Sequence, residues 1–136
     1  MLSVIVPCFN EERLIKKSIL EILKAIKICK ISKYEIIIVD DGSEDKSYVI
    51  SKKLINKYKN IKIVKNKKNY GIGYNFFKGV SLSQQKYLIQ IPADNSHPAK
   101  EISKILKFIN KRFDLVTTYY SNNAERSAFR NIFTLV

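Results

Sequence analysis

The sequence predicts a doubly wound α/β domain, in which helices cover both faces of a mostly parallel β-sheet. Strand-like and helix-like segments alternate along the whole chain, which is the order that produces parallel strands joined by helices. The segment YEIIIVD, residues 34–40, is apolar without alternation, as expected for a strand that is covered on both faces. The 136 residues suffice for one domain but not for two, so we treat 1–136 as a single domain.

The first strand and the first helix have clear signals. Residues 2–7, LSVIVP, form a short β-branched run that a proline ends, which predicts a buried strand. A helix is predicted from Glu11 to about Lys30, with Asn10 as its N-cap. The apolar residues expected on its buried face recur at spacings of three and four: Ile15, Ile19, Ile22, Leu23 and Ile26.

The strand at 34–40 is followed by the turn motif DGS and by a second predicted helix. This helix runs to about Lys59 and is capped by Ser43 or Asp45. Residues 60–66, NIKIVKN, predict a third strand that is more exposed than the first two. The inward residues of the second helix are expected to be Val49, Ile50, Leu54 and Ile55.

The alternation continues in the second half of the chain. Residues 69–83 begin with glycines and predict a small helix, and residues 86–91 predict a fourth strand. A longer helix is expected at 98–110 and a fifth strand at 113–119. Residues 124–136 resemble the beginning of another helix.

The chain is strongly basic, with 25 Lys and Arg against 12 Asp and Glu and a formal net charge of +13. Such an excess is typical of proteins that bind nucleic acid. Here it consists mostly of Lys spread over predicted helix surfaces, so we interpret it as solvated side chains and expect no nucleic-acid partner. The charge is compatible with contact to an anionic membrane surface or to a phosphorylated substrate.

The cysteine pattern and the hydropathy suggest a cytoplasmic protein. Cys8 and Cys29 lie in apolar surroundings without metal-ligand spacing, so no disulfide framework or zinc site is predicted. No basic region precedes the short apolar run at the N-terminus, and no stretch approaches 18 apolar residues, so neither a secretory signal nor a membrane-spanning helix is predicted. Peripheral contact with the cytoplasmic face of a membrane stays open.

Three loops that follow predicted strands carry carboxylates: PCFNEE at 7–12, DDGSED at 40–45 and PADNSHP at 92–98. In open parallel sheets, ligands bind in the crevice beyond the carboxyl ends of the strands. We therefore expect these three loops to form the ligand site.

The adjacent carboxylates Asp40 and Asp41 end a buried strand in a chain that has few acids. Gly42 lets the chain turn tightly and leaves backbone N–H groups free. A carboxylate at this position can accept hydrogen bonds from a nucleobase or from a ribose hydroxyl. A helix cap or an Asx-turn explains the same motif without any ligand.

Two further motifs also have a functional and a structural interpretation. The glycines of NYGIGYNFFKG, residues 69–79, have neither the spacing of a dinucleotide-binding loop nor the Lys-Ser/Thr ending of a P-loop, and a close turn with helix packing explains them equally well. Asp94 supplies one of the oxygen ligands that a metal ion bound to a pyrophosphate needs, and therefore only part of the ligand set. His97, the single histidine, is interpreted as a general base or as a loop-structuring residue.

Taken together and in this order, these motifs resemble the inverting glycosyltransferases of family 2, which have the GT-A fold. The similarity is greatest to the branch that contains dolichyl- and polyprenyl-phosphate mannose and glucose synthases. Four linked segments carry the resemblance at matching order and spacing across essentially the whole chain: SVIVPCFNEE (3–12), IIVDDGSED (37–45), NYGIGYNFFKG (69–79) and PADNSHP (92–98).

The resemblance implies roles for individual residues. In the family, the segment after the first strand lines the nucleotide pocket, and the glycine segment passes close to the nucleotide. The second of the paired acids, here Asp41, binds the base or the ribose, with Asp40 beside it. Arg126 and Arg130 match arginines that approach the phosphates of the donor and of the lipid acceptor, for which paired N–H donors are suited. The implied nucleotide-binding residues are Pro7, Phe9, Asn10, Glu11, Asp40, Asp41, Asn69, Gly71 and Gly73.

The sequence departs from the family at the metal segment and at the C-terminal end. The family motif Asp-x-Asp-x-Gln, followed by His-Pro, aligns with Pro92, Asp94 and Ser96, so Asp94 alone keeps a ligand position. The resemblance implies that Asp94 is catalytic and binds a divalent cation, Mg²⁺ or Mn²⁺, together with the donor diphosphate and waters. Tyr120 stands where the family has a basic residue, and the chain is expected to be truncated before the acceptor-binding segments.

The implied function is transfer of a sugar from a nucleoside-diphosphate sugar to a polyprenyl-phosphate or glycan acceptor, as in cell-envelope glycan synthesis. The alternative is a catalytically inactive or truncated remnant that binds a nucleotide sugar or partners another subunit; Pro92, Ser96 and the early end motivate it. A response-regulator-like domain also has paired acids. It requires a Lys at the end of the last strand, which the segment LVTTYY does not provide.

Overall fold

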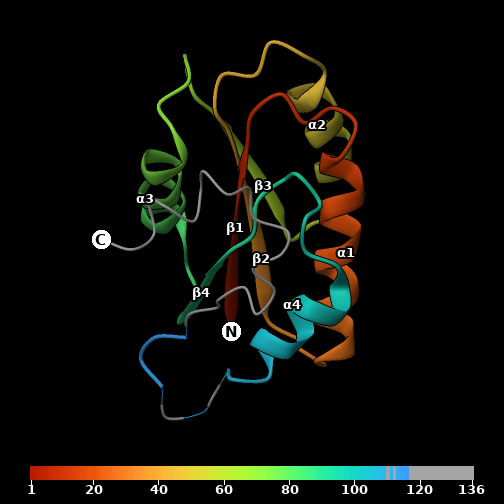
Figure 1. The fold of residues 1–136 in the computed structure, drawn as a ribbon, viewed down its shortest axis with the longest axis vertical. Helices are drawn as coiled ribbons and strands as arrows, with labels where there is room; N and C mark the ends of the chain where they lie inside the picture. The colour runs from red at the N-terminus through yellow and green to blue at the C-terminus, as the bar shows by residue number, and fades with distance from the viewer. Residues whose placement is uncertain (110, 112, 117–136) are drawn as a thin grey trace, which may run out of the picture.

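A four-stranded parallel sheet with helices on both faces forms the centre of the molecule (Figure 1). The computed structural model describes residues 1–109, 111 and 113–116. The order of the strands is β3-β2-β1-β4, so the predicted doubly wound fold is confirmed. The strands are β1 (Leu2–Cys8), β2 (Tyr34–Asp40), β3 (Ile61–Lys65) and β4 (Tyr87–Gln90), and the helices are α1 (Ile15–Ile28), α2 (Ser47–Lys57), α3 (Ile72–Leu82) and α4 (Ala99–Leu106).

The central strands β1 and β2 are buried on both faces. In β2, Ile36 and Ile38 belong to the apolar cluster that α1, α2 and α4 complete, whereas Ile37 and Val39 belong to the cluster under α3. Successive side chains of a strand point to opposite faces of the sheet. Both sets of positions must therefore be apolar, which explains the uninterrupted run in the sequence.

The distribution of the helices follows from the path of the chain. Helices α1, α2 and α4 cover one face of the sheet and α3 covers the other (Figure 1). The chain runs from β1 to β2 to β3 and then returns past β1 to form β4. Because crossovers between parallel strands are right-handed, the returning helix α3 lies on the face opposite α1 and α2. The reversal lies between β1 and β4, the point at which open α/β sheets bind ligands.

Helix α3 approaches the sheet closely because Gly79 faces β1. A Cβ atom at position 79 would collide with the side chain of Ile5, which is fully buried. Gly73 lies on the outer side of the same helix, where a Cβ atom would meet no other atom within 4 Å. Close packing therefore accounts for Gly79, one of the two interpretations of the glycine segment.

Helix α1 begins later than the sequence predicts. Its first residue is Ile15, preceded by Leu14 at the N-cap position, so the prediction that Asn10 caps this helix is wrong. Asn10 has a positive φ of 55°, and its side-chain oxygen accepts a hydrogen bond from the backbone N–H of Glu44 at 3.0 Å. The expected apolar face of the helix is confirmed: Ile15, Ile19, Ile22 and Ile26 are buried and Leu23 is partly buried.

Helix α2 and the segment after α4 also differ from the predictions. The N-cap position of α2 is Lys46, so the prediction that Ser43 or Asp45 caps this helix is wrong, although Asp45 accepts a hydrogen bond from the N–H of Ser47, the first helical residue, at 2.8 Å. Leu54 is buried as predicted, but Val49 is 53% exposed and points away from the core. Residues 113–116 form no strand; the rest of the expected fifth strand, 117–119, and the helix expected at 124–136 lie outside the described residues.

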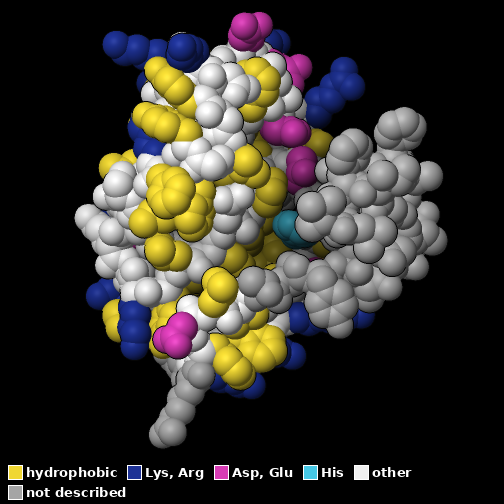
Figure 2. Space-filling view, turned by 60° about the vertical axis from the view of Figure 1, so that its left-hand side comes forward, with side chains coloured by type: hydrophobic (Ala, Val, Ile, Leu, Met, Phe, Trp, Pro, Cys, Tyr) yellow, Lys and Arg dark blue, Asp and Glu magenta, His cyan; other side chains and the backbone are white. Residues whose placement is uncertain are grey.

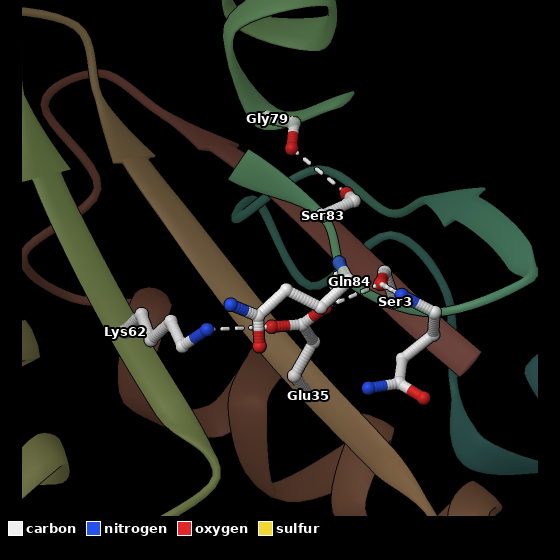
Figure 3. Close-up of polar contacts among 7 residues, drawn as sticks. Ser3, Glu35, Lys62, Gly79, Ser83 and Gln84 are labelled. Atoms are coloured by element: carbon white, nitrogen blue, oxygen red, sulfur yellow. Dashed lines mark hydrogen bonds and ion pairs between the residues drawn. The ribbon is translucent and has the colours of Figure 1, made fainter. Parts of the chain in front are cut away.

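A buried carboxylate connects the strands at their amino ends (Figure 3). Glu35 Oε1 accepts hydrogen bonds from Ser3 Oγ at 2.7 Å and from the backbone N–H of Gln84 at 2.6 Å, and Oε2 accepts one from Lys62 Nζ at 2.9 Å. Burial raises the pKa of Glu35, but the hydrogen bonds from Lys62, Ser3 and Gln84 outweigh it and hold the pKa below its ordinary value. The ionised side chain thus links β2 to β1, to β3 and to the segment before β4.

Replacing this carboxylate tests its contribution to stability. Glu35→Gln should lower the free energy of unfolding at pH 7 by about 1–3 kcal/mol, because an amide has one acceptor oxygen and cannot accept from both Lys62 and the N–H of Gln84. Glu101→Gln is the matched control; its pair with Lys104 (2.9 Å) is solvent-exposed and should contribute less than about 0.5 kcal/mol. Urea unfolding measures both.

The sign of the pH dependence follows from the lowered pKa of Glu35. The stabilisation is present above the ordinary glutamate pKa of 4.5 and is lost as the pH falls through the lower folded value. The difference between wild type and Glu35→Gln should therefore shrink in acid. Equal effects of Glu35→Gln and Glu101→Gln would contradict the assignment.

Candidate functional site

A hollow of about 210 Å³ lies beyond the carboxyl ends of the strands, at the reversal point of the sheet. The loops after β1, β2 and β4 and the segment that leads into α3 surround it. Asp41 and Asp94 both line this hollow, so the acids of two separate motifs meet at one site. Its lining residues are Pro7, Cys8, Phe9, Glu11, Asp41, Asn69, Gly71, Ile72, Asn75, Pro92, Ala93 and Asp94.

Hydrogen bonds tie the loop after β1 to the loop after β2. Three consecutive backbone N–H groups donate to side chains of the second loop: Asn10 to Ser43 Oγ (3.0 Å), Glu11 to Ser47 Oγ (2.7 Å) and Glu12 to Asp45 Oδ2 (2.9 Å). In return, Glu12 Oε2 accepts from the N–H of Lys46 at 3.0 Å. Most polar side chains after Asp41 in the DDGSEDKS motif therefore hold the neighbouring loop in place.

The adjacent carboxylates Asp40 and Asp41 do not face each other. Because successive strand residues point to opposite faces, Asp40 lies on the side of α1 and α2 and Asp41 on the side of α3. Asp40 is fully buried, and its Oδ1 accepts from the backbone N–H of Ser43 at 3.1 Å. Opposite orientation explains how two neighbouring acids coexist at the end of one strand.

Asp41 holds the segment that leads into α3. Its Oδ1 accepts from Asn66 Nδ2 at 2.7 Å and from the N–H of Tyr70 at 3.0 Å, and its Oδ2 accepts from the N–H of Gly71 at 2.8 Å. Burial raises the pKa of Asp41, but these hydrogen bonds, that from Asn66 foremost, outweigh it and keep the pKa below its ordinary value. Asp41 is therefore ionised at neutral pH.

Gly42 allows this arrangement to form. Its φ is +76°, and a Cβ atom at this position would lie 2.7 Å from the carbonyl carbon of Lys68. Only glycine therefore lets the turn after Asp41 pass so close to the segment before α3.

Sequence reasoning missed a buried amide pair beside Asp41. Asn66 Nδ2 also donates to Asn75 Oδ1 at 2.7 Å, and Asn66 Oδ1 accepts from Lys78 Nζ at 2.7 Å. Asn66 and Asn75 are 3% and 2% exposed. A signal for Asn66 exists in the sequence, because it directly follows β3 as Asp41 directly follows β2. Asn75 has no such signal, since its role depends on which side of α3 faces the sheet.

Helix α1 fixes both ends of the PADNSHP loop. Ser18 Oγ donates to the carbonyl of Pro92 at 3.1 Å, and Glu21 Oε2 accepts from the N–H of Ala99, the first residue of α4, at 2.6 Å. Between these anchors, Asp94 is exposed, and its Oδ1 accepts from both the N–H and the Oγ of Ser96, at 3.0 and 2.7 Å. The loop that carries Asp94 is thus positioned by a helix from the first third of the chain.

Two titratable groups at the hollow have raised pKa values. Burial, followed by the charges of Asp94 and Asp45, raises the pKa of Glu11. Burial and the charge of Asp40 raise the pKa of the Cys8 thiol to about 12. Cys8 therefore stays protonated at neutral pH, which argues against thiol catalysis at this site.

The donor set at the hollow does not fit a metal ion held by protein side chains alone. Across residues 1–109, 111 and 113–116, no group of three or more His, Cys, Asp or Glu could hold a metal ion. One oxygen of Asp94 is already occupied by Ser96, and Pro92 has no side-chain donor. We assign no chemical step to a metal ion.

The structure gathers most, but not all, of the predicted site residues. Three predicted residues lie outside the hollow: Asn10 and Asp40 hold loop geometry, and Gly73 is exposed on α3. Tyr120, Arg126 and Arg130 lie outside the described residues. The predicted residues that line the hollow are Pro7, Phe9, Glu11, Asp41, Asn69, Gly71 and Asp94.

A family model described as glycosyl transferase family 2 matches residues 3–133. The chain belongs to this family. Among its relatives is a dolichyl-phosphate beta-glucosyltransferase of Dictyostelium discoideum, 33% identical over 81% of the chain and 36% of the relative. Another is an undecaprenyl-phosphate 4-deoxy-4-formamido-L-arabinose transferase of Pectobacterium atrosepticum, 32% identical over 96% of the chain and 39% of the relative. The chain thus spans well under half the length of these two relatives.

Solved structures of glycosyltransferases share the fold. TarS of S. aureus, in a fragment 1–349 bound to UDP-GlcNAc, is 25% identical over 79% of the chain and 30% of that fragment, with a TM-score of 0.65. The mannosyltransferase PcManGT of Pyrobaculum calidifontis was solved with GDP-Man and Mn²⁺. Its match covers 68% of this chain and 27% of the PcManGT chain, at 20% identity and a TM-score of 0.61. The family's GT-A fold is therefore confirmed. No helix in the described part of this chain is long and apolar enough to cross a bilayer.

The hydrogen bonds of Asp41 predict a pH-dependent contribution to stability. Asp41→Asn should lower the free energy of unfolding at pH 7 by about 1–3 kcal/mol, because an amide opposes at least one of the three donors. Since the folded pKa lies below the ordinary value of 3.8, the loss should be full above that value and diminish as the pH falls further. Chemical unfolding between pH 2.5 and 7 measures it. Glu44 is an exposed acid of the same loop. If Glu44→Gln caused the same loss of stability, that result would argue against this role of Asp41.

Proposed function

We propose that this domain binds a nucleoside-diphosphate sugar in the hollow, and that the protein transfers the sugar to a polyprenyl-phosphate or glycan acceptor at the cytoplasmic face of a membrane. We propose that residues 1–136 form a single domain that binds the nucleotide sugar. The observation that carries it is the ionised side chain of Asp41, held beside a hollow at the reversal point of the sheet. Membership of family 2 and the transferases among the relatives support it.

The hydrogen bonds of Asp41 favour a uracil nucleotide. A carboxylate offers about four acceptor positions, and donors from Asn66, Tyr70 and Gly71 occupy three of them. The one position left, on Oδ2, suits a single N–H donor. Uracil presents one imide N–H, whereas guanine presents two adjacent donors on the corresponding edge. The TarS fragment, which shares 25% identity, was solved with UDP-GlcNAc and supports this choice.

The size of the hollow suggests how the donor lies. Its volume of about 210 Å³ is below the range of about 300–1,000 Å³ that encloses a drug-sized ligand. The nucleoside end therefore occupies the hollow, next to Phe9, a lining residue that is 42% exposed. The diphosphate and the sugar then extend over the rim toward Asp94.

The chemistry of the proposed transfer places few demands on a base when the acceptor is a lipid phosphate, whereas a glycan hydroxyl must give up its proton to a base. An oxygen of the acceptor attacks the anomeric carbon, the bond from that carbon to the diphosphate breaks, and the nucleoside diphosphate departs with the electron pair. A lipid phosphate is already anionic and loses no proton in this step. Arg126 and Arg130 are proposed to stabilise the phosphates. Asp94 stays the candidate ligand of the Mg²⁺ or Mn²⁺ that the resemblance implies, but no step depends on that ion here.

Nucleotide titration tests the binding part of the proposal. Isothermal titration of the whole chain should show UDP bound at least about tenfold more tightly than GDP. Phe9→Ala should lower the affinity for UDP about fivefold to tenfold, because the rim loses an aromatic contact. Phe77→Ala, on the outer side of α3 and 72% exposed, is the matched control and should change nothing. Failure of the wild type to bind UDP, GDP or their sugars would remove the proposal.

A transfer assay separates the enzyme from a second candidate, a domain that only binds the donor. The replacement of two family ligand positions by Pro92 and Ser96 favours that second candidate. With labelled UDP-sugars and polyprenyl phosphate, we expect product in membranes that express this chain, and we expect Asp94→Asn to reduce its rate of formation at least about tenfold. Glu44→Gln should leave the rate unchanged. UDP binding without any product would establish the binding-only function instead.

A further inference from the structure

The positive charge of this protein is concentrated in one continuous stretch. Between Lys46 and Ala93 the chain contains eleven Lys and no Asp, Glu or Arg. This stretch therefore accounts for most of the net charge of +13. It forms β3, which is an edge of the sheet, together with α2, α3 and β4. Because α2 and α3 cover opposite faces of the sheet, these lysines divide between two sides of the molecule. The side that α3 covers carries part of this positive charge, which attracts an anionic partner.

Exposed aromatic side chains lie within the cationic stretch, on the outer side of α3. Phe77 is 72% exposed, Tyr74 47% and Tyr70 44%, while Asn75 and Gly79 face the sheet from the same helix. Figure 2 shows hydrophobic side chains grouped on this side of the molecule, with Lys or Arg side chains at the outline of the view, mainly above the group and to its left. We call this region the α3 surface and define it by Tyr70, Tyr74 and Phe77 with Lys67, Lys68 and Lys78.

Cations and rings lie next to each other on the α3 surface. The rings of Tyr70 and Tyr74 stack with centroids 4.6 Å apart. Lys68 Nζ lies 5.5 Å from the centroid of Tyr70, and Lys78 Nζ lies 5.9 Å from that of Tyr74. Side chains that combine an apolar body with a polar or charged tip are favoured at the boundary between lipid headgroups and acyl chains.

We propose that the α3 surface binds an anionic lipid bilayer. The lysines neutralise headgroup charge, and Phe77, the most exposed of the three rings, enters the boundary region. An RNA would use the same lysines, but Tyr70 and Tyr74 stack on each other and Phe77 is flanked edge-on by Phe76 at 5.6 Å. A bilayer therefore fits the apolar part of the surface better than nucleobases do.

The location of the α3 surface links it to the hollow. Gly71, which precedes α3, donates its N–H to Asp41, and Ile72, the first residue of the helix, lines the hollow. Docking of α3 on a membrane would place the hollow beside the headgroup layer. This step rests on the proposed function, because a lipid-linked acceptor phosphate lies in that layer.

Vesicle binding tests the charged part of the surface. The whole chain should float with vesicles of phosphatidylcholine containing about 30% phosphatidylglycerol, should bind pure phosphatidylcholine at least about tenfold more weakly, and should dissociate as salt is raised. Each lysine near an anionic surface contributes about fivefold in affinity, so Lys67→Glu with Lys68→Glu should cost at least about 25-fold. Lys16→Glu with Lys17→Glu, two exposed lysines of α1, changes the net charge equally and should cost less than about threefold.

A second pair of variants tests the aromatic part. Phe77→Ser should weaken vesicle binding about tenfold, since the apolar area it buries is lost. Val49→Ser, at a 53% exposed apolar position of α2, should weaken it less than twofold. Thermal unfolding and UDP titration should be unchanged for both, which shows that the fold and the hollow are intact.

The outcomes separate this inference from the proposed function. Three outcomes would each overturn the proposal that the α3 surface binds a bilayer. The first is UDP binding without vesicle binding, and the second is an equal loss for the two double-lysine variants. The third is tighter binding of a single-stranded RNA with the same lysine dependence. Vesicle binding with the predicted variant pattern supports bilayer binding by the α3 surface, even where UDP does not bind, and in that case the proposed function fails alone.

Discussion

The side chain of Asp41 is the interaction on which the candidate site depends. It collects donors from Asn66 after β3 and from Tyr70 and Gly71 before α3. Both ends of the connection between β3 and α3 thus donate to one carboxylate, and their hydrogen bonds keep it ionised despite burial. Because these donors also fix where α3 begins, the same interaction determines one wall of the hollow and the direction of the outer face of that helix.

The polar residues of the strand-end motifs divide into two groups by direction. Those that point toward the loop after β1, such as Ser43, Asp45 and Ser47, accept hydrogen bonds from its backbone N–H groups. Those that point toward the reversal point of the sheet, such as Asp41 and Glu11, line the hollow. The first group supports ligand binding by the second. Because the loops are already ordered, binding loses less conformational entropy.

The sequence predicted the core of the fold well and the ends of its elements less well. The pattern of apolar residues located β2 and the buried face of α1. A strand that is buried on both faces gives a continuous apolar run, and a helix that is buried on one side gives apolar residues at spacings of three and four. Asn10 was predicted as a cap and Val49 as a core residue. Both predictions failed because contacts with the loop after β2 set the conformation of Asn10, and the packing of α2 on β3 selected which of its apolar residues turn inward.

The sequence by itself determined the parallel sheet, the loops that carry the site and, through four linked motifs, the family. Only the tertiary structure decided that Asp40 is buried away from the hollow, that Asn66 and Asn75 support Asp41, and that Ser18 and Glu21 position the loop of Asp94. The physical reason is distance along the chain. Local patterns encode periodicity within one element, whereas these partners lie up to 78 positions apart and meet only once the order of the strands is set.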